Sequence, residues 1–183
     1  MKKLLLLFVM AIGFSAYAQV VDYRDPEHYV IKNNGDTIFG KLKYTSSDDI
    51  KNKMTVKVND TLTLKFKADE IKYFRDGEKR YRSFQPDMED YYFIKIWEEG
   101  KYLSLYEWQV PAEISGSKVE FLPYIRQNDD KTYIELDIHW TKHFSELIAD
   151  YEQLADEVWK NKYKLEQLGD VVRHYNEWKA KNK

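Results

Sequence analysis

Short runs that alternate between apolar and polar residues dominate the chain from Tyr29 to Ile138. In a strand, an alternation with a period of two residues puts successive side chains on opposite faces. Clusters of turn residues separate the runs. The pattern predicts an α+β fold that is mostly β: an antiparallel β-meander of about eight to ten strands. An open sheet and a partly closed barrel both fit this pattern.

The first two hairpins have turn chemistry that predicts their registers. Asn34-Gly35 favours a two-residue type I′ turn, which would set Ile31 opposite Ile38. For the second hairpin, a three-residue loop is preferred to a two-residue loop because it keeps one consistent apolar face. The pairs expected there are Val58–Leu62, Val56–Leu64 and Met54–Phe66.

The last hairpin is expected between strands 119–126 and 131–138. A four-residue loop over 127–130 would set Phe121 opposite Leu136 and Val119 opposite Ile138.

The hairpin around Glu99-Gly100 is apolar on both of its predicted faces. With a two-residue loop, Ile94 and Ile96 face Leu105 and Leu103 on an aliphatic side. The aromatic side would carry Tyr91, Phe93, Trp97, Tyr102, Tyr106 and Trp108. Two uses of this aromatic side are open. The C-terminal helices cover it, or part of it stays exposed as a stacking platform for a glycan or a peptide.

The hydrophobic period changes to three and four residues from about residue 141, which predicts C-terminal helices. The segment 141–163 reads as one helix or as two short helices, with Thr141 or Ser145 as the N-cap. Its apolar face contains Phe144, Leu147, Ile148, Tyr151, Leu154, Val158 and Trp159. Another helix is predicted from 169 to about 181, with Val171, Val172, Tyr175 and Trp178 on its apolar stripe. We expect these helices to dock on a sheet face or edge. If they cover the aromatic side, the contacts would come from Phe144, Tyr151, Trp159 and Tyr175.

Residues 1–18 have the anatomy of a secretory signal peptide. Lys2 and Lys3 precede an eleven-residue apolar run, LLLLFVMAIGF, and Ser15-Ala16-Tyr17-Ala18 supplies the small residues of a cleavage site. The run is too short to span a bilayer, which takes ~20 residues. We therefore expect an exported protein with one domain over 19–183 and no membrane span in the mature chain. The chain has no cysteine, so neither disulfides nor a cysteine-linked lipid is expected.

Charge adds a further expectation about partners. The formal net charge is −2, and loss of Lys2 and Lys3 with the leader makes the chain more acidic. Basic and acidic residues interleave along the sequence, which predicts no basic stripe for nucleic acid and no polybasic membrane patch.

The sequence offers few groups with catalytic or metal-binding potential. His139 and His143 have the i,i+4 spacing of helical metal ligands but lack an intervening HExxH-type carboxylate, so we expect two boundary histidines near solvent. Asp87–Asp90 is a conceivable calcium loop without the spacing of a specific one. Acidic pairs occur at Asp48-Asp49, Glu98-Glu99 and Asp129-Asp130. They lie in predicted turns, and no catalytic motif is present, so no catalytic residue, metal or cofactor is predicted.

The segment Tyr29–Leu42, YVIKNNGDTIFGKL, resembles the beginning of small, uncharacterised exported proteins of Bacteroidota. In those proteins an NGDTIxGK-like hairpin follows a signal peptide that is cut before a glutamine. The run FKADEIKYF at 66–74 and the terminal His174-Tyr175-Asn176 are similar as well. The resemblance implies an envelope location and no mechanism.

These observations favour a non-enzymatic exported protein, in the envelope or secreted, with a structural or interaction role. Its partner would be a protein or glycan of the cell envelope. One alternative is a glycan- or peptide-binding module that uses the aromatic hairpin. Another is a hydrolase with an unrecognised carboxylate site.

Overall fold

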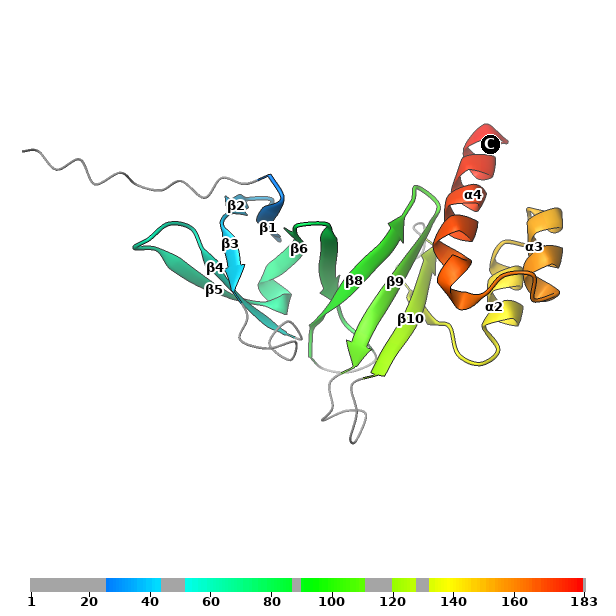
Figure 1. Ribbon diagram of the computed structural model, residues 1–183, viewed down its shortest axis with the longest axis horizontal. Helices are drawn as coiled ribbons and strands as arrows, with labels where there is room; N and C mark the ends of the chain where they lie inside the picture. Colours follow the sequence, from blue (N-terminus) through cyan, green and yellow to red (C-terminus); the bar gives the residue numbers. More distant parts are fainter. Residues whose placement is uncertain (1–25, 44–51, 87–89, 111–119, 128–131, 183) are drawn as a thin grey trace, which may run out of the picture.

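The computed structural model describes residues 26–43, 52–86, 90–110, 120–127 and 132–182. These residues form an open, meander-like antiparallel sheet that is followed by three helices packed on it, which confirms the predicted fold class (Figure 1). The strands are β1 (His28–Lys32), β2 (Thr37–Phe39), β3 (Lys41–Lys43), β4 (Lys53–Lys57), β5 (Thr63–Lys67), β6 (Ile71–Asp76), β7 (Lys79–Phe84), β8 (Tyr92–Glu99), β9 (Leu103–Val110), β10 (Glu120–Gln127) and β11 (Ile134–Glu135). The helices are α2 (Trp140–Leu147), α3 (Glu152–Trp159) and α4 (Leu168–Lys181), with 3-10 turns at Ala68–Glu70 and Leu165–Gln167.

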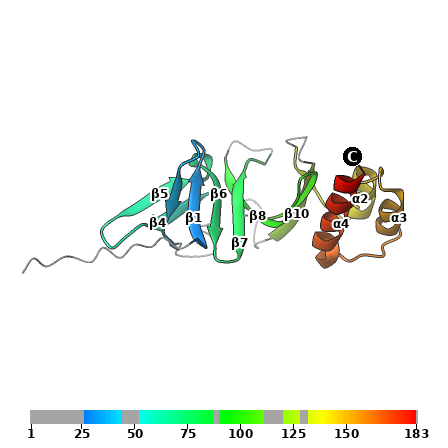
Figure 2. The ribbon, with the colours of Figure 1, turned by 90° about the horizontal axis from the view of Figure 1, so that it is seen from above.

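The strands divide between two sheets. The large sheet has eight strands in the order β11-β10-β9-β8-β7-β6-β1-β2, and the small sheet has three in the order β3-β4-β5. The small sheet lies at one end of the molecule and the helices at the other, with β8, β9 and β10 between them (Figures 1 and 2).

One face of the large sheet is covered by two different layers. The strand registers place the side chains of Val30, Phe74 and Phe93 on the same face as those of Leu105 and Ile125. At the β1 end, the small sheet covers this face with Leu42, Met54 and Val56. At the β10 end, the helices cover it with Phe144, Ile148, Leu154, Val158, Leu168, Val171, Val172 and Tyr175. A sheet face this wide is therefore buried in two separate cores.

The chain passes from the large sheet to the small sheet at Gly40. Its backbone N–H still donates to the His28 carbonyl (3.1 Å), yet the next residue begins β3. A Cβ on Gly40 would lie 2.6 Å from the Lys57 carbonyl oxygen and 2.8 Å from Val56 Cγ1. Only glycine allows the backbone to cross β4 this closely.

The first hairpin has a different register from the predicted one. Val30 pairs with Ile38, and Ile31 pairs with Thr37, so the two-residue type I′ turn is wrong. Gly35 alone in this loop has a positive φ (91°), whereas a type I′ turn also needs one at Asn34. A three-residue loop closed by Gly35 shifts the pairing by one residue and brings Val30 into the core.

The second hairpin has the predicted register, with Met54 opposite Phe66 and Val56 opposite Leu64.

The last hairpin does not have the predicted register. Ile125 pairs with Ile134, and the Leu136 N–H donates to the Pro123 carbonyl (2.9 Å), a shift of two residues from the expected pairing. The shift lets Leu136 join the core beside Ile125, while Phe121 and Ile138 are exposed. Val119 lies outside the described residues.

The C-terminal segment forms two short helices, α2 and α3, followed by α4, so the two-helix alternative for 141–163 is confirmed. The predicted caps are wrong, because α2 begins at Trp140 and no side chain caps its N-terminus. Asp137 instead accepts a hydrogen bond from the His139 N–H (2.8 Å). Trp159, predicted on the apolar face, is 54% exposed because it is the last residue of α3.

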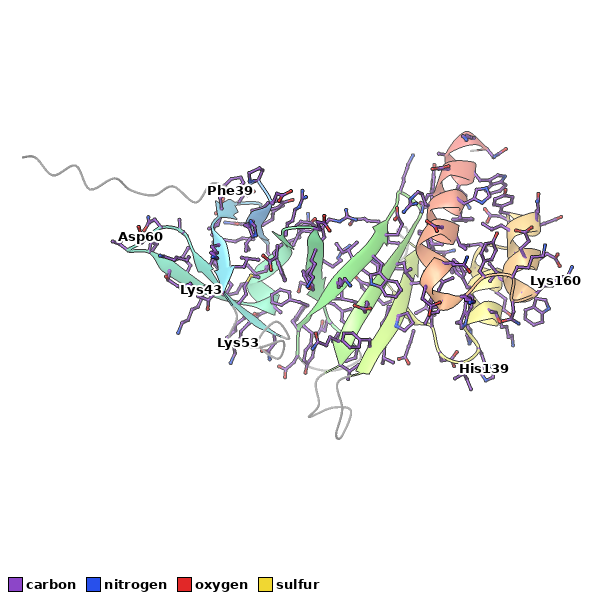
Figure 3. The ribbon with its side chains drawn as sticks, in the orientation of Figure 1. Phe39, Lys43, Lys53, Asp60, His139 and Lys160 are labelled. Atoms are coloured by element: carbon purple, nitrogen blue, oxygen red, sulfur yellow. The ribbon has the colours of Figure 1, made fainter. Side chains whose placement is uncertain are left out.

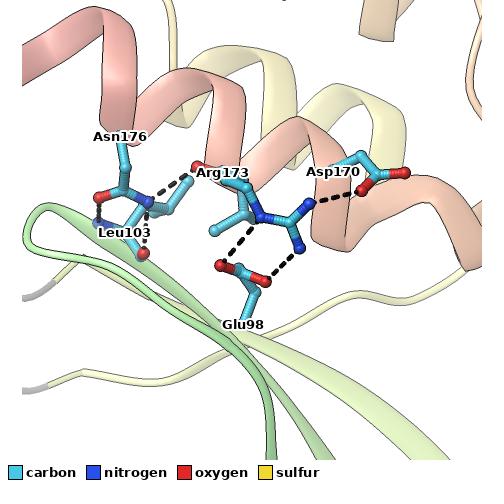
Figure 4. Close-up of polar contacts among 6 residues, drawn as sticks. Glu98, Leu103, Asp170, Arg173 and Asn176 are labelled. Atoms are coloured by element: carbon cyan, nitrogen blue, oxygen red, sulfur yellow. Dashed lines mark hydrogen bonds and ion pairs between the residues drawn. The ribbon is translucent and has the colours of Figure 1, made fainter.

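Asn176 joins α4 to the β8–β9 turn (Figure 4). Its Oδ1 accepts from the Tyr102 and Leu103 N–H groups (2.8 and 3.1 Å), and its Nδ2 donates to the Leu103 carbonyl (2.8 Å). A Cβ on Gly100 would lie 2.2 Å from Asn176 Cγ, so the turn needs glycine here. Arg173 adds an ion pair to Glu98 (2.8 Å). A side chain of α4 thus satisfies backbone groups that the hairpin leaves open.

Asp150 links the turn between α2 and α3 to α4. It accepts hydrogen bonds from the Tyr175 hydroxyl (3.0 Å) and from Lys179 Nζ. Burial acts to raise the pKa of the Asp150 carboxyl, but the hydrogen bonds from Lys179 and Tyr175 outweigh it and hold that pKa below its usual value. The same contacts raise the pKa of Lys179.

Replacing Gly40 with alanine should destabilise the protein by about 1–3 kcal/mol, because the new methyl group overlaps the backbone of β4. The control is Gly169→Ala in α4, where a Cβ meets nothing within 4 Å and helix propensity improves. Urea unfolding of both variants measures the difference. Equal stability of Gly40→Ala and the wild type would contradict the proposed crossing.

Asn176→Ala should lower the free energy of unfolding by about 3 kcal/mol, because it leaves three backbone groups of the β8–β9 turn without their partner. Asn182→Ala serves as the matched control, since that amide only donates to the exposed Trp178 carbonyl. Thermal and urea unfolding should separate the two variants. If Asn176→Ala lowered the free energy of unfolding no more than Asn182→Ala does, the contact between Asn176 and the β8–β9 turn would be contradicted.

Asp150→Asn should remove a pH-dependent part of the stability. A depressed pKa in the folded state means that the contribution is complete above the ordinary carboxyl pKa and is lost as the pH falls through the folded value. The stability difference between wild type and Asp150→Asn should therefore shrink between about pH 4 and pH 2. Glu177→Gln, at an exposed position of α4, is the control. A difference that does not change with pH would contradict this assignment.

Candidate binding surface

The aromatic hairpin does not have the predicted two-residue loop. Ile96 pairs with Tyr106 and Lys95 with Glu107, and a bulge between Ile96 and Glu98 shifts the rest of the register. The turn is longer than expected because it wraps around Asn176, and the bulge at Trp97 accommodates the extra length.

The six residues predicted for an aromatic platform are therefore divided among different environments. Phe93 packs edge-on against Phe74 in the core under the small sheet, with ring centroids 4.9 Å apart. Trp97 and Tyr102 pack against the helical core. Tyr106 and Trp108 are buried on the opposite face of the large sheet, and Tyr91 is 41% exposed.

The helices cover the aliphatic side of this hairpin, where Leu103 and Leu105 lie, and leave Tyr106 and Trp108 on the other side. Of the residues predicted for the aromatic side, the helical core contacts Trp97 and Tyr102, whereas Tyr106 and Trp108 belong to a different core. The register is the reason: the observed pairing puts Ile96 on the same face as Tyr106, so neither face is purely aliphatic or purely aromatic.

The opposite face holds an aromatic core around Arg82. Arg82 Nη1 donates to the Tyr106 hydroxyl (3.2 Å), and the rings of Tyr106 and Tyr133 lie 5.2 Å apart. Burial raises the pKa of the Tyr133 hydroxyl. Two buried donors, Arg82 Nε and Trp108 Nε1, have no hydrogen-bond partner in the part of the chain that is described. Tyr106 and Trp108 are buried, and Arg82 and Tyr133 are half-buried around them, so most of this cluster is a core.

A small groove of about 230 Å³ lies on the covered face of the large sheet. An ion pair between Lys95 and Glu107 (3.2 Å) lies in it. Burial, followed by the carboxylates of Asp76 and Glu107, raises the pKa of Tyr81 to about 12. The Lys95–Glu107 pair links β8 to β9, which is typical of a structural contact.

The outer face of the small sheet carries a dense group of lysines. Because Leu42, Met54 and Val56 point into the core, the residues that alternate with them point outward. We call this outer face the lysine surface. It consists of Lys41, Lys43, Lys53, Lys57, Lys65 and Lys67, with Thr55 and Thr63 between them.

Like charges lie directly opposite each other on the lysine surface. Lys41 pairs with Lys57 across the β3–β4 ladder, and Lys53 pairs with Lys67 across the β4–β5 ladder. Lys57 has an acidic partner in Asp60 (2.7 Å). The other five lysines form no ion pair with any described residue. Figure 3 shows Lys43 and Lys53 on the small sheet, far from His139 and Lys160 at the helical end.

A groove borders this surface. It encloses about 970 Å³, a size common for ligand sites. Four members of the lysine surface line it, namely Lys43, Lys53, Lys65 and Lys67. Leu42, Met54 and Phe66 add apolar atoms, and Glu70 and Asp76 add carboxylates. Basic and apolar groups thus meet at the edge of the small sheet.

The expectation that basic residues form no patch was wrong. The interleaved charges gave the sequence an even appearance, but a strand sorts alternate residues to opposite faces. Lysine at six of the eight alternate positions of three paired strands was the signal that could have revealed the lysine surface.

The other candidate groups do not converge on a site within the described ranges. Glu98 pairs with Arg173 and Glu99 with Arg80 (3.6 Å). His139 and His143 are exposed, as expected, and His143 lies 3.8 Å from Asp137. The described residues contain no group of three metal-ligating side chains. Asp48-Asp49, Asp87–Glu89 and Asp129-Asp130 lie outside them.

Comparison with known proteins found no relative. No family model matches the chain, and neither a curated protein sequence nor a solved structure is similar to it at a significant level. Of the helices that are described, none has the length and apolar character needed to cross a membrane. The lysine surface and its groove are therefore the strongest candidate site on the basis of geometry alone.

Proposed function

We propose that this chain is an exported, non-enzymatic interaction protein that binds a polyanionic component of the cell envelope through the lysine surface. The observation that carries the proposal is the outer face of the small sheet, where six lysines and two threonines form one continuous side. The chain as a whole is slightly acidic, so this concentration of positive charge is local.

The lysine surface has an energetic cost that a polyanion would offset. Like charges directly opposite each other in an antiparallel sheet destabilise it. Two such pairs occur here, Lys41–Lys57 and Lys53–Lys67. A negatively charged partner turns this repulsion into attraction and steers association over about a Debye length.

Export is supported by the sequence of the first eighteen residues and by the resemblance of the 29–42 segment to exported proteins. A non-enzymatic role is supported by the way in which the described acidic side chains are used. Glu98, Glu99 and Glu107 each pair with a basic side chain on the sheet or on α4. Such pairing positions secondary-structure elements.

Elution from a heparin column in a salt gradient tests the proposal. The triple variant Lys41→Gln, Lys53→Gln, Lys65→Gln should elute at clearly lower salt than the wild type, because each lysine adds to the salt-dependent attraction. The matched control is Lys142→Gln, Lys160→Gln, Lys164→Gln, which removes the same charge from exposed positions at the helical end.

The control should elute with the wild type. Equal shifts for the two triple variants would mean that only net charge matters, and a wild type that passes through unbound would rule out polyanion binding. Circular dichroism of all three proteins checks that they are folded.

A further inference from the structure

We infer that the polyanion is the anionic headgroup layer of a lipid bilayer, on which the lysine surface docks flat. The inference rests on the proposed function and specifies its partner. It depends on the shape of the lysine surface and on the residue types within it.

The lysine surface spreads its charges in two dimensions. Neighbouring strands lie about 4.8 Å apart, and side chains on one face of a strand recur about every 6.8 Å. Three paired strands, each with two lysines on this face, therefore form a grid. A linear polyanion contacts one row of such a grid at a time, whereas a plane of headgroups contacts all rows together. The two-dimensional arrangement of the lysines therefore matches a plane of lipid headgroups better than a linear polyanion.

The residue types on this face favour headgroups over nucleic acids and glycans. Proteins that hold single-stranded nucleic acids add aromatic side chains on which bases stack. The outer face of the small sheet carries lysines and threonines at all its described positions. The aromatic side chain of this sheet, Phe66, alternates with Lys65 and Lys67 and belongs to the inner side. A surface made only of lysine ammonium groups and threonine hydroxyls is suited to binding phosphate headgroups.

The position of the small sheet gives the docked molecule a direction. The labelled residues Phe39, Lys43, Lys53 and Asp60 lie at one end and His139 and Lys160 at the other (Figure 3). A bilayer bound at the lysine surface therefore contacts the small-sheet end and leaves the helices turned away from it.

Flotation with vesicles of two compositions tests the inference. The purified protein should float with vesicles of equal parts phosphatidylglycerol and phosphatidylcholine and should stay at the bottom with phosphatidylcholine alone. The triple variant Lys41→Gln, Lys53→Gln, Lys65→Gln should bind the anionic vesicles about 100-fold more weakly, as expected for three lysines near a charged membrane. The helical-end triple variant should bind like the wild type.

Retention on heparin without flotation on anionic vesicles would overturn the lipid inference and leave the proposed function standing. Failure in both assays would overturn both, and equal flotation with the neutral vesicles would overturn the charge-based docking.

Discussion

The close crossing at Gly40 is the constraint on which the rest of the N-terminal half depends. The chain leaves the large sheet there and enters the small sheet, with room for a hydrogen atom and not for a methyl group beside the Lys57 carbonyl. This crossing folds β3, β4 and β5 back over Val30 and Phe74 and closes the first core. It also turns the lysines of these strands outward, so the candidate binding surface follows from the same backbone feature.

The opposite end of the large sheet is completed by different means. The helices bury Leu103 and Leu105, and Asn176 fixes their position by binding the backbone of the β8–β9 turn. The sheet is thus a shared platform with a strand layer at one end and a helical layer at the other. Such a division separates the lysine surface from the helices.

The sequence was sufficient for the fold class and for elements whose register depends on local alternation. The β4–β5 pairing is an example, because Met54 and Val56 had to share one face with Phe66 and Leu64. The β8–β9 register was missed because its turn is shaped by Asn176, more than seventy residues away along the chain. Composition concealed the lysine surface, which exists only after three strands pair. The leader of residues 1–18 lies outside the described residues and remains a prediction from the sequence.

The most direct measurement of the central claim uses the absence of cysteine in the chain. A single cysteine introduced as Thr55→Cys, on the lysine surface, is labelled with a fluorophore and compared with one introduced as Lys160→Cys at the helical end. With vesicles that contain phosphatidylglycerol and a lipid-borne quencher, the label at position 55 should be quenched and the label at position 160 should not. Equal quenching at both positions, or stronger quenching at position 160, would contradict the account.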